Sequence, residues 1–149
     1  MRLTLAHIGP RASSKDPLDA TVEAYLKRCS TYAQSCSEAF KTEAAFIDWL
    51  ARQPGRTPAT AILLDSRGRQ MSSELFANWL GARRNQGAQH LVFAIGPASG
   101  WSTEARARAE LLLSFGPMTL AHSLARLVMA EQLYRAVTIL TGHPYHTGH

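Results

Sequence analysis

The sequence predicts an α/β fold with a mainly parallel sheet and helices on both faces of that sheet. Strand-like apolar runs alternate with helical patterns along the chain, and this alternation is typical of layered α/β proteins. Two runs, TAILLD at 60–65 and QHLVFAI at 89–95, are almost continuously apolar, as expected for parallel strands buried on both faces. With 149 residues and 46% hydrophobic content, residues 1–149 are expected to form a single domain.

Each predicted element rests on a local pattern of residues. Residues 2–8 alternate polar and apolar side chains and end at Gly9-Pro10, which indicates a strand followed by a turn. Apolar residues at helical spacing predict the helices, and Thr42, Ser72 and Ser102 stand where N-caps are expected. The strand at 60–65 is followed by a predicted loop, 66–69. The predicted strands are 2–8, 37–41, 60–65, 89–95 and 111–115, and the predicted helices cover 16–32 and 118–140 and begin after 42, 72 and 102.

The helix predicted at 118–140 carries apolar residues on two faces. One face has Leu124, Leu127 and Val128, and the other includes Met129 and Leu133. A helix that is apolar around most of its girth needs two partners. We expect these partners to be the sheet and a second copy of the chain, in an obligate homodimer.

Polar residues on the same helix form two pairs with i,i+4 spacing. These pairs are His122 with Arg126, and Glu131 with Arg135. Polar side chains on a covered helix must be satisfied or functional. For Glu131 and Arg135, both an ion pair at a subunit contact and a role in a site remain open, and His122 stands at the junction of a loop and the helix.

Charge and hydropathy limit the classes of partner. The formal net charge is +5 and the pI is near 9.7, which favours an anionic partner but is weak evidence for nucleic acid. No apolar run approaches the roughly 20 residues of a membrane span. The start, MRLTLAHIG, alternates and lacks the apolar core of a signal peptide. We therefore expect no membrane partner and a cytoplasmic location.

Histidines near the end of the chain invite a metal interpretation. His143, His146 and His149 recur at every third residue, but no carboxylate or cysteine lies beside them. Zinc sites in proteins draw on such mixed ligand sets. We therefore expect no metal site, and a tail shaped for substrate instead.

Unusual residues follow three of the predicted strands. They are Leu64-Asp65, the glycine-containing stretch 96–100, and the stretch 115–121. In parallel sheets, ligands bind beyond the carboxyl ends of the strands, so these stretches are expected to converge. The sequence has no G-x-G-x-x-G or G-K-[ST] phosphate motif, and no cue nominates a catalytic triad. The pattern predicts a pocket for a flat heterocycle such as adenine, held by backbone groups and dispersion.

Several motifs carry a family resemblance. The segments IGPASGW, SFGPMTLAHSLAR, VMAEQLYRA and HPYH, with LDSRGRQMSSELFA in the middle, resemble the large-subunit ribosomal RNA methyltransferase H family over nearly the whole chain. The resemblance implies a SPOUT-type α/β fold with a C-terminal trefoil knot, and a homodimer whose active site forms between subunits. It also implies methyl transfer from S-adenosylmethionine to N3 of a pseudouridine in 23S ribosomal RNA, within the large subunit or the assembled ribosome.

The expected reaction and the basic residues suggest roles for individual side chains, and the resemblance supplies the cofactor-binding positions. The acceptor N–H must lose its proton, so Tyr145 and His146 in the tail, or His122 and Glu131 on the helix, are candidate bases or orienters. By position, the cofactor-binding residues are Leu64, Asp65, Gly96, Pro97, Gly116, Pro117, Met118, Thr119, Leu120 and Ala121. The expected RNA contacts are Arg126 and Arg135, which also hold the dimer-spanning site, and a surface set of Lys15, Lys27, Arg28, Arg67, Arg69, Arg83 and Arg84.

Two positions depart from the family pattern. Pro97 stands where a second consecutive glycine is usual, and proline fixes φ and removes a backbone donor. Thr147 follows His146 where a basic residue is usual. These departures favour an alternative, a non-catalytic RNA- or ribosome-binding module that retains the fold. An adenine-nucleotide-binding enzyme of another reaction type is a more distant alternative.

Overall fold

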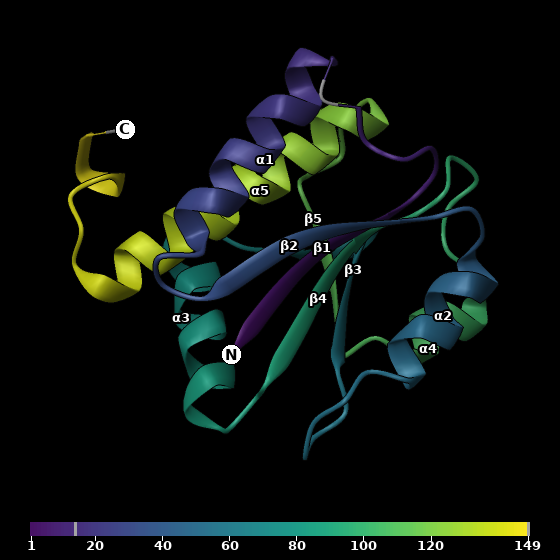
Figure 1. The fold of residues 1–149 in the computed structure, drawn as a ribbon, viewed down its shortest axis with the longest axis horizontal. Coiled ribbons are helices and arrows are strands. Elements are labelled where there is room, and N and C mark those ends of the chain that lie inside the picture. The colour runs from purple at the N-terminus through teal and green to yellow at the C-terminus, as the bar shows by residue number, and fades with distance from the viewer. Residues whose placement is uncertain (14, 149) are drawn as a thin grey trace.

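The sheet of the protein has five parallel strands. The structure is a computed structural model that describes residues 1–13 and 15–148. The strand order is β2-β1-β4-β3-β5, and every pair of neighbours is parallel, so the predicted mainly parallel sheet is confirmed (Figure 1). The strands are β1 (Arg2–Ile8), β2 (Gln34–Phe40), β3 (Thr60–Gln70), β4 (His90–Ile95) and β5 (Leu111–Ser114).

Helices cover both faces of this sheet, as predicted. Helices α1 (Pro17–Cys29), α3 (Ser73–Asn85) and α5 (His122–Thr141) lie on one face, and α2 (Glu43–Ala51) and α4 (Thr103–Arg108) lie on the other (Figure 1). Strand β4 shows why both faces are apolar: Leu91 and Phe93 join the core under α1, α3 and α5, while Val92 and Ala94 join the core under α2 and α4. Among residues 1–13 and 15–148, no helix is long and apolar enough to cross a membrane.

The last helix begins later than the sequence pattern predicted. The prediction of a helix from Met118 is wrong, because α5 begins at His122 and the preceding residues form a loop. Gly116 has φ +111°, a conformation that L side chains rarely adopt, and Pro117 follows it. Helices α1 to α4 each have a side chain that caps the first turn, whereas no side chain caps α5. The start of α5 therefore depends on tertiary contacts.

Strand β3 is longer than predicted. The prediction that it ends at Asp65, before a loop at 66–69, is wrong in part, because pairing with β5 resumes at Arg69. Leu64 and Arg69 both pair with Leu113, so the residues between them form a bulge. A Cβ on Gly68 would lie 2.6 Å from the backbone carbonyl of Leu112, which explains why glycine occupies the bulge.

The limits of two other elements also differ. The first helix ends at Cys29 and not at 32, and β2 covers Gln34–Phe40 and not 37–41. The whole of β2 pairs in register with β1, although its residues are mostly polar. Because β2 is an edge strand, it lacks the continuous apolar run that marks a central parallel strand.

A buried histidine links β4 to β1. His90 is 3% exposed, and its Nε2 lies 2.7 Å from Thr4 Oγ1. Arg2 Nη2 donates to His90 Nδ1 at 3.1 Å, so the ring is a neutral imidazole that donates through Nε2. Burial, with a smaller contribution from the Arg2 charge, lowers the pKa of His90 to about 4.

This histidine predicts that the protein loses stability in mild acid. The unfolded chain binds a proton on His90 below pH about 6.5, whereas the folded chain does so only near pH 4. The free energy of unfolding therefore falls as pH drops through this window, by up to about 3 kcal/mol from this residue. Urea titrations at pH 7.0, 5.5 and 4.5 measure the loss.

The variant His90→Gln should lose less stability over the same pH range, because the amide does not titrate. His143→Gln, at an exposed histidine, is the matched control and should follow the wild type. Equal losses for His90→Gln and the wild type would contradict the assignment. His7 and His122 also have lowered pKa values, so some acid sensitivity should persist.

Candidate active site

Three strand ends meet around one cavity of about 550 Å³, as the sequence predicted. The cavity lies beyond the carboxyl ends of β3, β4 and β5 and the start of α5. Eight of the ten predicted cofactor-binding residues line it: Leu64, Asp65, Gly96, Pro97, Gly116, Met118, Thr119 and Leu120. Pro117 and Ala121 belong to the same loop and are exposed.

Trp101 joins two walls of this cavity. The indole Nε1–H donates to the Leu64 carbonyl at 3.0 Å, and the side chain is 4% exposed. A Cβ on Gly96 would lie 2.7 Å from Trp101 Cε2, so only glycine lets the turn after β4 approach the ring this closely. Trp101 ends the IGPASGW motif, but its role could not be predicted, because no local pattern reveals which backbone group an indole will meet.

The carboxylate of Asp65 accepts hydrogen bonds from two segments beside the cavity. Arg106 Nε donates to Asp65 Oδ2 at 2.9 Å, and the backbone N–H of Arg67 donates to Oδ1 at 2.8 Å. The Asp65 side chain is 6% exposed. Its oxygens thus fix α4 and the β3 bulge relative to each other. No local pattern indicates the contact with Arg106, which is 41 residues away in the sequence.

The loop before α5 is tied to the end of β5. The Ser114 hydroxyl accepts the Gly116 N–H at 3.0 Å and lies 3.3 Å from the carbonyls of Ser66 and Gly116. Beyond it, Phe115 and Met118 are 36% and 83% exposed, and Leu124 on α5 is 39% exposed. Of these, Phe115 and Met118 line the cavity, so exposed apolar side chains lie at its edge.

His122 closes the cavity at the first turn of α5. Its ring lies beside the Gly96 carbonyl, which favours the protonated form, and its Nε2 is buried without a hydrogen-bond partner among residues 1–13 and 15–148. Burial lowers the pKa of His122, with a smaller effect from the Arg126 charge. His122 is thus a neutral imidazole at pH 7.

The other predicted catalytic residues form a separate cluster. Glu131 Oε1 accepts from Arg135 Nη2 at 2.6 Å and from the Tyr145 hydroxyl at 3.1 Å. Arg135 Nη1 donates to His146 Nδ1 at 2.9 Å, and His146 Nε2 donates to Glu74 Oε1 at 2.7 Å. We call these five residues the tail cluster.

The tail cluster holds its groups in defined protonation states. Burial, together with Tyr25 and Glu131, raises the pKa of Tyr145, so the phenol keeps its proton at pH 7. The bond to Glu131 raises the pKa of Arg135, and the bond from His146 lowers the pKa of Glu74. In this arrangement, Tyr145 and Glu131 orient each other.

One chain does not bring the tail cluster to the cavity. At 1.5 Å per residue, Glu131 lies about 14 Å and Arg135 about 20 Å along α5 from His122. Figure 1 shows the tail packed beside the far end of α5, away from the first turn of that helix. His122 is therefore the only predicted catalytic residue of the four at the cavity of the same chain.

The predicted RNA-binding arginines fall into two groups. Arg67 and Arg69 are exposed on the β3 bulge, and Arg67 also lines the cavity. Arg126 is 3% exposed and pairs with Asp19, and Arg135 is held in the tail cluster. The RNA contacts themselves stay a prediction, although Arg126 does not reach the surface of this chain.

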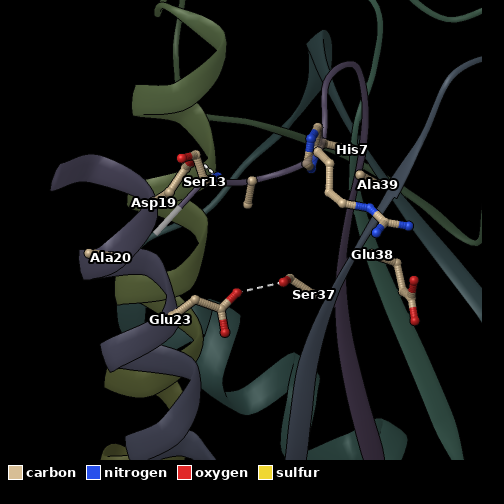
Figure 2. A pocket seen from close by; sticks show the side chains of 10 residues that line it. His7, Ser13, Asp19, Ala20, Glu23, Ser37, Glu38 and Ala39 are labelled. Carbon is tan, nitrogen blue, oxygen red and sulfur yellow. Dashed lines mark hydrogen bonds between the residues drawn. The ribbon is translucent and has the colours of Figure 1, made fainter. Parts of the chain in front are cut away.

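A second cavity, of about 640 Å³, lies between α1 and the carboxyl ends of β1 and β2. Figure 2 shows Glu23 of α1 facing Ser37 of β2, whose hydroxyl donates to Glu23 at 2.6 Å. His7 and Asp19 also line it. This cavity is larger, but it contains none of the predicted cofactor-binding residues.

Metal-ligand geometry is absent from the part of the chain that the structure describes. No group of three or more His, Cys, Asp or Glu side chains there could hold a metal ion. His143 is exposed, and His146 contacts Arg135 and Glu74. His149, the third histidine of the tail pattern, lies outside the described residues.

Comparisons with known proteins agree with this architecture. The family model described as a predicted SPOUT methyltransferase matches residues 1–146. The solved structure of a probable methylase family protein from Haemophilus influenzae Rd KW20 has a TM-score of 0.54 at 9% identity, covering 97% of this chain and 69% of that one. At this low identity, the structural likeness concerns the fold alone.

Two relatives match over almost their full length. Ribosomal RNA large subunit methyltransferase H from Koribacter versatilis (strain Ellin345) is 47% identical and covers 100% of both chains. The protein of the same name from Rhodospirillum centenum (strain ATCC 51521 / SW) is 41% identical and covers 98% of this chain and 99% of its own.

The fold and the family model together define the class, which is that of the SPOUT methyltransferases. Within this class, the chain belongs to the family of ribosomal RNA large subunit methyltransferase H. The resemblance expected from the motifs is therefore confirmed. The trefoil knot stays a prediction.

Because Gly96 and Trp101 are in close contact, adding one methyl group at position 96 should lower the stability of the protein. Gly96→Ala should displace the indole, break its bond to Leu64, and lower the free energy of unfolding by about 1–3 kcal/mol. Urea unfolding and hydrogen exchange of the Trp101 indole N–H measure both effects. The exposed neighbour in the same turn provides the control Ala98→Ser, which should change neither. A protected indole N–H in Gly96→Ala would contradict the close packing.

Proposed function

We propose that the chain transfers the methyl group of S-adenosylmethionine to large-subunit ribosomal RNA, at N3 of a pseudouridine in 23S rRNA. By family resemblance, the target is pseudouridine 1915. The observation that carries this proposal is the 550 Å³ cavity at three strand ends, lined by the loops that bear the family motifs. Residues 1–149 would form one catalytic domain, and the protein would act in the cytoplasm.

The residues around the cavity fit the cofactor. Its volume is within the range for small-molecule sites, and Leu64, Leu113 and Leu120 offer apolar surface for an adenine ring. The backbone groups of Gly96 and of the loop 116–121 would form hydrogen bonds with the polar edges of the adenine ring. Pro97 offers no N–H, and its carbonyl accepts the Gly100 N–H at 2.8 Å. S-adenosylmethionine would supply an electrophilic methyl carbon.

The chain's own residues would orient the acceptor and remove its proton. Holding the acceptor nitrogen in line with the methyl carbon, in a site that excludes water, accounts for much of such a reaction. His122 is a neutral imidazole at pH 7, and its Nε2 has no hydrogen-bond partner among the described residues, which supports it as a candidate proton acceptor. Tyr145 would align the base through the hydroxyl held by Glu131, and His146 would contact the base or a nearby phosphate.

The site would be completed by a second copy of the chain. The tail cluster is about 14–20 Å from the cavity along α5, too far for its groups to act there in one chain. The exposed Phe115 and Met118 at the edge of the cavity, and Leu124 on α5, offer apolar surface for a partner. We infer a homodimer in which each cavity faces the tail cluster of the partner.

The RNA would approach over the β3 bulge. Arg67 and Arg69 project there beside the cavity, and the net charge of +5 favours a polyanion. Arg135 would act within the dimer-spanning site, where its guanidinium already orders Glu131 and His146.

Binding and product analysis together test the activity. Calorimetry should detect S-adenosylmethionine with a Kd on the order of 1–100 μM, the lower part of the usual range for enzyme substrates. Labelled methyl should enter 50S or 70S particles at the pseudouridine, located by mass spectrometry. Particles with uridine at that position are the matched control and should stay unlabelled. RNA binding without cofactor binding would instead identify the non-catalytic module that Pro97 and Thr147 favour.

Mixed dimers test the shared site. Leu120→Trp fills the cavity, and His146→Ala removes a tail-cluster side chain, so each variant alone should be inactive. In a 1:1 mixture, half of the dimers carry both variants and one intact site, so about a quarter of wild-type activity should return. The activity of the coexpressed variants is compared with the activity of each variant purified separately. Activity that stays at the level of the single variants, with both folded, would mean that the tail acts within its own chain.

A further inference from the structure

Four polar side chains from three elements meet at the first two turns of α5. They are His7 of β1, Asp19 of α1, and His122 and Arg126 of α5. His7 and Arg126 are 2% and 3% exposed, and the His7 and His122 rings meet edge to face with centroids 5.5 Å apart. Arg126 Nη1 donates to Asp19 Oδ1. Figure 2 shows His7 and Asp19 on the side of the second cavity.

The start of α5 has no local means of stabilisation. No side chain caps it, and its first turn contains no acidic residue. Arg126 places a positive charge in the second turn, close to the positive end of the helix dipole, which is unfavourable. It is also buried, where an unpaired charge is costly. Asp19, which lies on the neighbouring helix α1, offsets both of these costs.

Asp19 is itself held in place. The backbone N–H of Ser13 donates to its Oδ2 at 2.8 Å, and this bond, reinforced by Arg126, holds the pKa of Asp19 below its usual range. The ion pair therefore ties the first turn of α1 to the second turn of α5. His122 stands one turn before Arg126 and contacts the Gly96 carbonyl.

A buried ring supports the opposite side of His122. His7 Nε2 donates to the Pro10 carbonyl at 2.6 Å, so this ring is fixed where the chain leaves β1. His7 then forms a wall against which His122 packs. His122 is thus confined between the His7 ring, the Gly96 carbonyl and its own helix.

We infer that Asp19 and Arg126 are positioning residues, which hold the start of α5, and with it His122, in the place that completes the cofactor cavity. This inference deepens the proposed function and rests on it. It also assigns Arg126 a place inside the fold in addition to the RNA contact expected from the sequence. Asp19 lies outside the motifs that carry the family resemblance.

A double-mutant cycle tests whether the ion pair acts through His122. Asp19→Asn keeps the shape of the side chain and removes its charge. We expect Asp19→Asn and His122→Ala each to weaken S-adenosylmethionine binding about 10-fold by calorimetry, and the double variant to bind about 10-fold weaker as well, because coupled sites are not additive. A double variant about 100-fold weaker would show independent effects and overturn the inference.

A second readout needs no cofactor. In the wild type, NMR should detect nuclear Overhauser contacts between the His7 and His122 rings, because their centroids lie 5.5 Å apart. Asp19→Asn should lose that ring contact. If the ring contact and the affinity both persist while Tm falls by about 5–15 °C, Asp19 has only a structural role and the inference fails.

Two further samples separate the possible failures. Asp48→Asn breaks an exposed pair with Arg52 on α2 and should leave the affinity and the ring contact unchanged. If Asp19→Asn does not fold, Arg126→Gln, which removes the charge of the other member of the ion pair, replaces it in the cycle with the same expected coupling. A wild type that fails to bind S-adenosylmethionine refutes the proposed function, whereas the NMR result still decides the positioning of His122.

Discussion

The close contact between Trp101 and Gly96 determines the shape of the site. The indole is buried, bonds to the carbonyl that ends the core of β3, and lies against the turn that follows β4. This contact brings two strand ends together, and His122 of α5 lines the cavity that they form. The cavity therefore depends on a close approach that only a residue without a side chain allows.

The layered fold could be predicted because its central strands are buried on both faces. The apolar runs of β3 and β4 mark such strands directly. The continuation of β3 to Gln70 could not be predicted, because a bulge interrupts the ladder and polar residues fill it. The first turn of α5 was also misjudged, since apolar spacing continues through Met118 while Gly116 and Pro117 direct the chain away from helical geometry.

The location of the cavity could be predicted from strand ends, but the partners of its charges could not. Arg126 and Asp19 are more than 100 positions apart, and a helical pattern indicates which residues share a face without indicating what covers that face. The i,i+4 pair of Glu131 and Arg135 was visible in the sequence and is present. The bond from His146 to Glu74 depends on the path of the tail past α3, which no local signal records.

The strand order has a consequence for how the chain folds. The inner partner of β1 is β4, and Arg2 pairs opposite His90. At a synthesis rate of about 5–20 residues per second, several seconds separate the emergence of these two strands from the ribosome. During that interval β1 can pair only with the polar edge strand β2. The nascent chain therefore exposes one open, apolar strand edge, and chaperones that shield such edges would matter most before β4 is made.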